Sequence, residues 1–273
     1  MDYVSDNGNY YGFVTNHYGG NLVRLDFGSS LLNTPVATNL GNFGGILPST
    51  FGSEGIQVVK QNGNWFAIIT GGHDVSSSTS PRVVKIEFGT NIANPVPIAT
   101  NWGNIGNMDF PIDLHLYEDA GRWYGITINS QNNTITRFDF TNSFSNVPVA
   151  TNLGNIGGLD YPTGIFVTTD KGKWYAFVVN QSEIPGQKST ITRLDFGNSL
   201  NNTPTGTNLG KMGGLLYDTR DITILKSCDQ TIGFAINGGG SNSNIIRLDF
   251  NNDLSSVPVA SVAGNLVNGT LAH

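Results

Sequence analysis

Apolar and polar residues alternate along many short segments of this chain, which is the pattern of β-strands. In the segment from Arg24 to Phe27, Leu25 and Phe27 fall on one face, whereas Arg24 and Asp26 fall on the other. Successive side chains of a strand point to opposite faces, so such a segment has one buried side and one more polar side. No long segment with the period of a helix separates these strands. The pattern therefore predicts an all-β fold.

The alternating segment recurs five times. Its copies begin with a basic residue at positions 24, 85, 137, 193 and 247 and end with phenylalanine at positions 27, 88, 140, 196 and 250. Each copy belongs to a unit of four predicted strands, here called a, b, c and d, in which the repeated copy is strand c. In one unit Gly164–Asp170 forms strand a and Trp174–Asn180 forms strand b. Repeated units of four short strands are typical of a β-propeller.

The turns and the ends of the chain support five blades. Pairs such as Asn7-Gly8 between strands a and b are typical of two-residue hairpin turns. Residues 261–273 align with residues 207–219, so the chain stops almost where it begins after five units. We therefore expect a closed five-bladed β-propeller with four antiparallel strands per blade, forming one domain over residues 1–273. The competing interpretation is a fragment of a longer array.

A basic residue and an acidic residue recur two positions apart in every strand c. Five identical catalytic sites would be improbable, so we expect each pair to act as an ion pair or a hydrogen-bonded staple within its blade. Such pairs can fix geometry when they are buried. The pairs are Arg24 and Asp26, Lys85 and Glu87, Arg137 and Asp139, Arg193 and Asp195, and Arg247 and Asp249.

Positions at which the copies differ are the better candidates for function. The b–c and d–a loops lie on one side of a propeller, and loops on a rigid scaffold often carry function. An asparagine ends strand b in four blades, where it could cap a turn or contact a ligand. Strand a has a mixed column at Gln57, His115, Phe166 and Thr223. The predicted ligand-binding residues are Asn16, His17, Tyr18, Glu54, His73, Asp74, Trp102, Asp113, His115, Asn129, Asn180, Asn237 and Asp221.

Some of these residues allow a second interpretation. Histidine and aspartate side chains on the loop side could hold a metal ion, but they share no local ligand spacing, so we expect no metal and no cofactor. Trp102 stands where other copies have leucine. It could stack on a sugar, or it could simply replace a core leucine.

Composition narrows the choice of partners. Charged residues make up 12% of the chain and the formal net charge is −6, which argues against a nucleic-acid partner. Cys228 is the single cysteine, so no disulfide can form within the chain. No apolar run approaches the roughly 18 residues of a membrane span, so no membrane insertion is expected. The first residues lack the basic and apolar regions of a signal peptide.

The repeated sequence from strand c to strand d resembles a known group of proteins. The pattern RLDFGxSLxNTPVATNLGNxGG, read from Arg24 onward, is similar to repeats of large secreted or cell-surface proteins of Bacteroidota, which often stand beside PKD domains and a gliding-type secretion tail. The general plan also resembles the five-bladed lectin propellers, although no sugar-site residue can be carried over. The resemblance implies an extracellular propeller module. We expect a monomeric module of a larger chain that is located outside the cell or at the cell surface.

Three functions remain open at this stage. The leading expectation is a non-catalytic recognition or adhesion module that binds carbohydrate through the b–c and d–a loops, with glycans or a cell-surface protein as partners. The alternative is a rigid spacer or protein-interaction platform in a large surface protein. A second alternative is a glycoside hydrolase whose carboxylates at the channel mouth are Glu54, Asp113 and Asp221, because hydrolysis of a glycosidic bond needs a pair of carboxyl groups.

Overall fold

The computed structural model describes residues 1–49, 52–73, 80–181, 189–238 and 243–265. In these residues the regular structure is β-strand, apart from the short 3-10 helix η1 (Met212–Gly214). The strands form five four-stranded sheets, and each sheet consists of four strands that follow one another in the sequence. The repeats therefore predicted the fold correctly: the protein is a five-bladed β-propeller, and each sheet is one blade.

The chain divides into two compact units, which we describe separately. The first contains residues 1–132 and 136–152, and the second contains residues 133–135 and 153–273. The division crosses the strands β11 (Thr134–Thr141) and β12 (Val149–Gly154) close to one end of each. A single domain over the whole chain and a closed ring both stay predictions.

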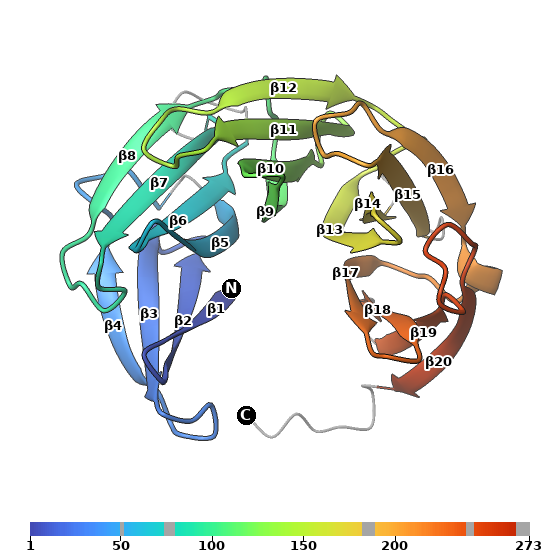
Figure 1. Ribbon diagram of the computed structural model, residues 1–273, viewed down its shortest axis with the longest axis horizontal. Coiled ribbons are helices and arrows are strands. Elements are labelled where there is room, and N and C mark those ends of the chain that lie inside the picture. Colours follow the sequence, from blue (N-terminus) through green and yellow to red (C-terminus); the bar gives the residue numbers. More distant parts are fainter. Residues whose placement is uncertain (50–51, 74–79, 182–188, 239–242, 266–273) are drawn as a thin grey trace. The chain divides into compact units, whose positions relative to one another are not determined.

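The first unit holds blades one to three. In Figure 1 the first strand of each blade, namely β1, β5 or β9, lies on the inner side of this unit, and the fourth strand lies on its outer edge. The twelve strands are β1 (Asp2–Asp6), β2 (Asn9–Asn16), β3 (Asn21–Gly28), β4 (Val36–Gly41), β5 (Ser53–Gln61), β6 (Asn64–Gly71), β7 (Arg82–Gly89), β8 (Ile98–Gly103), β9 (Pro111–Asp119), β10 (Arg122–Asn129), β11 (Thr134–Thr141) and β12 (Val149–Gly154).

The second unit holds blades four and five. Their first strands, β13 and β17, lie against each other. The eight strands are β13 (Pro162–Asp170), β14 (Lys173–Asn180), β15 (Thr190–Gly197), β16 (Thr205–Gly210), β17 (Thr219–Lys226), β18 (Thr231–Asn237), β19 (Asn244–Asp249) and β20 (Val259–Asn265).

The hairpin turns have the geometry that their sequences predict. In blade one, both central residues of the turn between β1 and β2 are left-handed, with φ of 49° at Asn7 and 77° at Gly8. The same pair of positive φ values occurs at the corresponding turns of blades two, three and four. This is the type I′ turn, whose twist matches that of the two strands it joins. Blade five has a different turn, in which the Ser227 N–H donates to the Gln230 carbonyl at 2.9 Å.

The hydrophobic core of each unit lies between neighbouring blades. In the first unit, Phe13 of blade one meets Phe88 of blade two with ring centroids 5.2 Å apart. In the second unit, Phe177 of blade four meets Phe250 of blade five at 5.0 Å. All four rings are buried. The repeated phenylalanine of strand c therefore seals the contact between one blade and the next.

Small residues in strand b make room for the apolar side chains of strand c. A Cβ atom at Gly125 would lie 3.1 Å from Phe138 and 3.3 Å from Phe140. A Cβ atom at Gly233 would lie 3.2 Å from Phe250. The small residue therefore lets strand c side chains of the same blade lean across the sheet, which is a packing role.

Repeated asparagine and aspartate side chains hold the turns through bonds to the backbone. Asp26 accepts a hydrogen bond of 2.9 Å from the Gly28 N–H, and Asn33 donates one of 2.8 Å to the Phe27 carbonyl. Such side chains favour turns because they replace a missing backbone partner. The first contact recurs at Asp139, Asp195 and Asp249, and the second at Asn94 and Asn202.

The basic residue of the repeated pair does not make the same contact in every blade. Lys85 lies 3.2 Å from Glu87, and Arg247 makes the equivalent ion pair at 3.4 Å. Arg24 instead donates a hydrogen bond of 3.2 Å from Nη1 to the Asn94 carbonyl in blade two. In blade one the expected staple within the blade is thus a staple between blades, because the long guanidinium reaches the next c–d loop.

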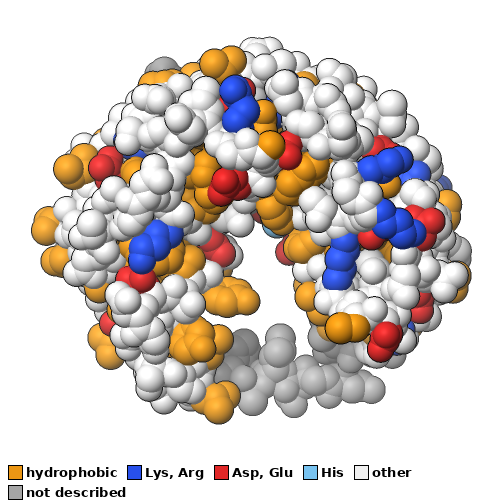
Figure 2. All heavy atoms as spheres, in the orientation of Figure 1, with side chains coloured by type: hydrophobic (Ala, Val, Ile, Leu, Met, Phe, Trp, Pro, Cys, Tyr) orange, Lys and Arg blue, Asp and Glu red, His pale blue; other side chains and the backbone are white. Residues whose placement is uncertain are grey.

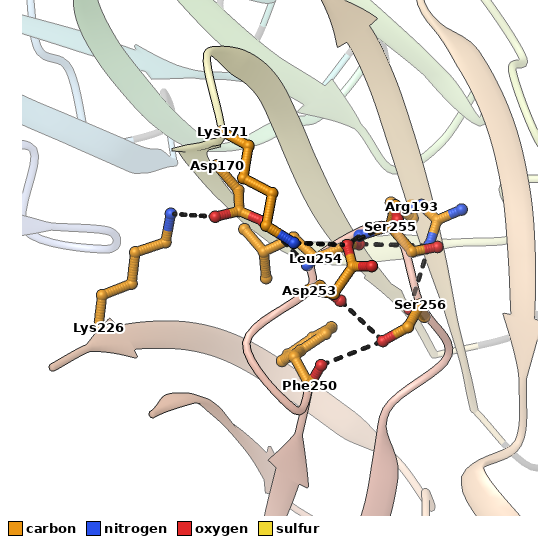
Figure 3. A network of polar contacts seen from close by, with 9 residues as sticks. All are labelled: Asp170, Lys171, Arg193, Lys226, Phe250, Asp253, Leu254, Ser255 and Ser256. Carbon is orange, nitrogen blue, oxygen red and sulfur yellow. Dashed lines mark hydrogen bonds and ion pairs between the residues drawn. The ribbon is translucent and has the colours of Figure 1, made fainter. Parts of the chain in front are cut away.

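Arg193 makes the corresponding contact between blades four and five (Figure 3). Its Nη1 atom donates to the carbonyls of Leu254 and Ser256 at 3.2 and 3.1 Å, and also to that of Ser255. Asp170 accepts a hydrogen bond of 3.3 Å from the Leu254 N–H. The c–d loop of blade five is therefore held by side chains from blade four on both its N–H and its carbonyl groups.

We expect Arg193→Ala to lower the free energy of unfolding by about 1–3 kcal/mol, because three carbonyl groups lose a charged donor. Arg247→Ala is the matched control, since it breaks an ion pair whose side chains are 39% and 48% exposed. It should cost less than about 1 kcal/mol. Urea denaturation of both variants measures the difference, and equal losses would contradict the staple between blades.

Candidate functional site

A β-bulge near the start of strand a presents two acidic residues in the first unit. The register between β5 and β6 leaves Glu54 as an extra residue, and the register between β9 and β10 leaves Asp113. A bulge bends the strand and turns the extra side chain in a new direction. The sequence placed both residues just before strand a, but the strands begin earlier, because pairing continues on the far side of the bulge.

The two bulges lie against each other. A Cβ atom at Gly55 would stand 2.9 Å from the Asp113 carbonyl carbon and 3.0 Å from the Leu114 nitrogen. Only glycine permits backbones to approach so closely without displacement. The residue that follows Glu54 therefore touches Asp113 directly, and the structure brings together these two predicted site residues from different blades.

His17 holds Glu54 from the b–c loop of blade one. The His17 Nδ1 atom lies 2.6 Å from Glu54 Oε1, and both side chains are only partly exposed. The imidazole is placed by Gly52, where a Cβ atom would lie 3.0 Å from the ring. Burial raises the pKa of Glu54 above its ordinary value, while the charge of His17 and the hydrogen bond from it lower the pKa. On balance the pKa of Glu54 is raised, so Glu54 keeps its proton to a higher pH than an ordinary glutamate does.

Asp113 has a strained backbone that is fixed on several sides. Its φ of 56° lies in the left-handed region, which is uncommon for a residue with a side chain. The Thr127 hydroxyl donates a hydrogen bond of 2.6 Å to its carbonyl, and its own Oδ1 atom accepts one of 2.8 Å from the Leu114 N–H. Strain of this kind is often found at functional sites.

Two ring side chains follow Asp113 on the same face of β9. The His115 Nε2 atom lies 3.9 Å from Asp113 Oδ2. The rings of His115 and Tyr117 are stacked, with centroids 6.0 Å apart and planes 4° from parallel. Burial, and after it the negative charge of Asp113, raise the pKa of Tyr117 to about 12. The tyrosine therefore keeps its proton.

The mixed column of strand a joins the inner strands of the first unit. Asp2 Oδ2 accepts a hydrogen bond of 2.6 Å from the Val58 N–H, and Gln57 Oε1 accepts one from the Leu116 N–H. Burial raises the pKa of Asp2, although the hydrogen bonds to its carboxylate lower it. In these two blades the column carries contacts between blades, so variation in it does not by itself indicate a ligand.

A second polar cluster lies on the loop side of blades two and three. His73 Nε2 lies 3.1 Å from Gln131 Oε1, and His73 Nδ1 lies 4.0 Å from Asp109 Oδ1. The cluster is linked to the Glu54 region, because the Gly72 N–H donates to the Gly52 carbonyl at 3.2 Å. The predicted site residue Asp74 lies outside the described residues, as do parts of three b–c loops (74–79, 182–188 and 239–242).

The asparagines that end strand b are structural in three blades. Asn129, Asn180 and Asn237 are each no more than 1% exposed. Asn237, for example, accepts a hydrogen bond of 3.1 Å from the Tyr217 N–H and donates one of 2.8 Å to the Leu215 carbonyl. It thereby ties the d–a loop to the sheet. These three residues are inaccessible to a ligand, which corrects their prediction as binding residues. Asn16 is exposed, but its Oδ1 atom caps the local turn.

Trp102 packs in the core between blades two and three. Its ring lies 6.0 Å from that of Phe140, and the Lys85 ammonium lies 5.9 Å from its centre. This packing agrees with replacement of a core leucine, and because Trp102 is only half-buried, its contact with a ligand stays a prediction. The tryptophan ring packs there because the space between the blades is apolar.

Asp221 belongs to the second unit, at the start of β17. Its Oδ1 atom accepts a hydrogen bond of 2.7 Å from the Ile222 N–H, as Asp113 does from Leu114. It lines a cavity of about 220 Å³ together with Thr223 and Phe234. The cavity walls are mostly apolar, so this carboxylate is not accompanied there by a second one among the described lining residues.

The described residues contain no group of three or more histidine, cysteine, aspartate or glutamate side chains placed to hold a metal ion. No helix among them is long and apolar enough to cross a membrane. On the face seen in Figure 2, basic and acidic side chains are interspersed.

Sequence reasoning missed Tyr117 and Thr127. The signal for Tyr117 was present, because Asp113, His115 and Tyr117 are spaced by two and therefore share one face of a strand. The role of Thr127 had no such signal, since its contact with Asp113 depends on the bulge and on the pairing between β9 and β10.

Comparison with known proteins shows similarity in structure. The sequence matches no protein-family model and no curated protein. An exo-1,5-alpha-L-arabinanase from a bovine ruminal metagenomic library has a TM-score of 0.54 at 14% identity, with 95% of each chain covered. A GH43 beta-1,3-galactosidase has a TM-score of 0.62 at 13% identity, covering 97% of this chain and 94% of that chain. The Cellvibrio cellulosa alpha-L-arabinanase has a TM-score of 0.56 at 10% identity, covering 95% and 93%.

These similarities correct the leading functional expectation. The expectation of a non-catalytic recognition or adhesion module was wrong, because the solved structures that share this fold over nearly their whole length are named as glycosidases. The glycoside hydrolase alternative agrees better with them. At such low identity the likeness itself shows the fold alone.

The Glu54 carboxyl should titrate above its ordinary value of 4.5, because burial outweighs the effects of His17. In His17→Ala its pKa should rise further, since both effects that lower it come from His17. Carbon-13 NMR of the side-chain carboxyl groups measures both shifts. Asp253 is the control: hydrogen bonds from Ser255 hold its pKa below 3.8, and it should titrate identically in the variant. A Glu54 pKa at or below 4.5 would contradict the proposed environment.

Proposed function

We propose that this protein is a glycoside hydrolase whose acid and base are Glu54 and Asp113. The observation that carries the proposal is the contact between the two bulges, which places two carboxyl-bearing residues on touching backbones. Hydrolysis of a glycosidic bond uses one carboxyl group as a proton donor and a second as a base or nucleophile.

Glu54 is the proton donor. Burial favours its protonated form, and His17 at 2.6 Å orients the carboxyl group. A general acid must still carry its proton near the working pH, and enzymes reach this state by burying a glutamate. Protonation of the bridging oxygen of the substrate by Glu54 makes the departing sugar a neutral alcohol.

Asp113 is the base or nucleophile on the opposite side of the reaction. One of its oxygens accepts a hydrogen bond from the Leu114 N–H, which fixes the direction of the carboxyl group. The other oxygen lies toward His115. The left-handed backbone and the bond from Thr127 keep the carboxylate in one direction, so it needs little rearrangement to act on a water molecule or on the sugar carbon.

The substrates to test come from the structural neighbours. Their names include alpha-L-arabinan-cleaving enzymes, a beta-1,3-galactosidase and a beta-fructofuranosidase. Arabinan, beta-1,3-galactan and sucrose therefore form the first panel. A location outside the cell, expected from the repeat sequence, would suit a polymeric substrate.

Glu54→Gln and Asp113→Asn should each reduce hydrolysis by about 10²–10⁴-fold, because each removes a group that moves a proton or attacks carbon. Asparagine tolerates the left-handed backbone at position 113, so this variant should fold. Glu118→Gln is the matched control, since Glu118 is an exposed carboxylate near the other end of β9. Release of reducing sugar measures the rates. Unchanged hydrolysis in both site variants would overturn the proposal.

The rate should fall as the pH rises through the pKa of Glu54, because the proton donor is lost. Since His17 lowers that pKa, His17→Ala should move the alkaline limb of kcat/KM to higher pH. A pH–rate profile from about pH 4 to pH 9 measures the shift. The assignment of Glu54 as the acid fails if the limb moves to lower pH or stays in place.

A further inference from the structure

Tyr18 is an exposed aromatic residue beside the Glu54 site. It is 84% exposed, and it follows His17 in the b–c loop of blade one. A single exposed apolar side chain needs no explanation by itself. The way in which this loop is built, however, separates Tyr18 from an ordinary surface residue.

The loop that carries Tyr18 is fixed on both sides of the tyrosine. Asn16 Oδ1 accepts a hydrogen bond of 2.9 Å from the Gly19 N–H, and the Asn16 carbonyl accepts one of 3.0 Å from the Gly20 N–H. Gly20 has a φ of 59°, and a Cβ atom there would lie 2.3 Å from the Ser49 nitrogen. The turn therefore fits closely against the d–a loop of blade two, and substitution of this glycine would separate them.

The ring of Tyr18 is also set against the site. Its centroid lies 4.4 Å from that of His17 in an edge-to-face arrangement of 74°. His17 in turn contacts Glu54 at 2.6 Å. A continuous series of contacts thus leads from the exposed ring to the proposed proton donor, while most of the ring surface stays open to solvent.

We propose that Tyr18 is a substrate-binding residue on which a neutral sugar ring of the substrate stacks. This inference rests on the proposed hydrolase function and adds the substrate contact. A tyrosine offers a large rigid surface at a small cost in conformational entropy, and the apolar C–H face of a sugar packs on such a ring. Binding sites commonly combine an aromatic surface with a few polar groups.

Charge specifies the class of sugar. The site holds the carboxylate of Asp113, and the chain has a net charge of −6. A uronic acid would bring further negative charge to this region and be repelled. Tyr18 therefore binds a neutral pyranose or furanose ring of an oligosaccharide. A polyuronate, which should not bind, is the negative control.

The kinetic experiment compares Tyr18→Ala, Tyr18→Phe and the control Leu32→Ala on the neutral glycan that the wild-type protein hydrolyses. Leu32 is 96% exposed and lies in the c–d loop, on the opposite side of blade one from the b–c loop. Tyr18→Ala should raise KM roughly tenfold with kcat changed less than about twofold. Tyr18→Phe and Leu32→Ala should resemble the wild type. An unchanged KM in Tyr18→Ala, or an equal loss in Tyr18→Phe, would overturn stacking.

A binding experiment separates this inference from the proposed function. Affinity electrophoresis in arabinan, beta-1,3-galactan or polygalacturonate compares Glu54→Gln with the double variant Glu54→Gln, Tyr18→Ala. If a neutral glycan retards the single variant but not the double variant, stacking on Tyr18 is supported even if hydrolysis is never found. If both variants are retarded equally, or neither is retarded by any glycan, stacking on Tyr18 is overturned. Loss of hydrolysis in Glu54→Gln would still support the catalytic assignment in that case.

Discussion

Burial of the faces of each sheet against neighbouring blades is the constraint on which this structure depends. A four-stranded sheet with apolar side chains on both faces cannot be stable alone in water, because those side chains would stay exposed. The seams of phenylalanine, such as Phe13 with Phe88 and Phe177 with Phe250, provide the burial within each unit. The small residue of strand b (glycine or alanine) and the phenylalanine of strand c are two parts of the same packing solution, which explains why both recur in the blades.

Polar repeats serve the same scaffold. The many asparagines and aspartates of this chain first appear to be candidates for ligand binding, yet most of those described bond to backbone groups of turns. Asp26 and Asn33 form hydrogen bonds with backbone groups at the end of a strand, and Asn237 ties a d–a loop to its sheet. Arg193 extends this principle across a blade boundary. A propeller with few charged residues thus uses neutral amide groups and isolated guanidinium groups to fix its loops.

The proposed chemistry uses a bulge that recurs at the start of strand a in blades two to five and that carries an acidic residue only in blades two and three. The bulges at Glu54 and Asp113 each add one residue to a strand, and the absence of a side chain at Gly55 lets the two bulges touch. Partial burial raises the pKa of Glu54, and Asp113 stands beside it with a left-handed backbone. Features that would be unfavourable elsewhere thus stand together on a framework rigid enough to maintain them.

The sequence by itself determined the fold class, the number of blades and the positions of the hairpin turns, because strand alternation and turn chemistry are local and are written five times. It also marked Glu54, Asp113 and His17 as candidates, since they lie on the loop side at positions where the copies differ. Only the tertiary structure decided which candidates meet. It buried Asn129, packed Trp102 against Phe140, and joined His17 of blade one to Glu54 of blade two. These outcomes depend on contacts between blades and on a one-residue shift in strand pairing, and neither quantity is encoded in the spacing of residues along one repeat.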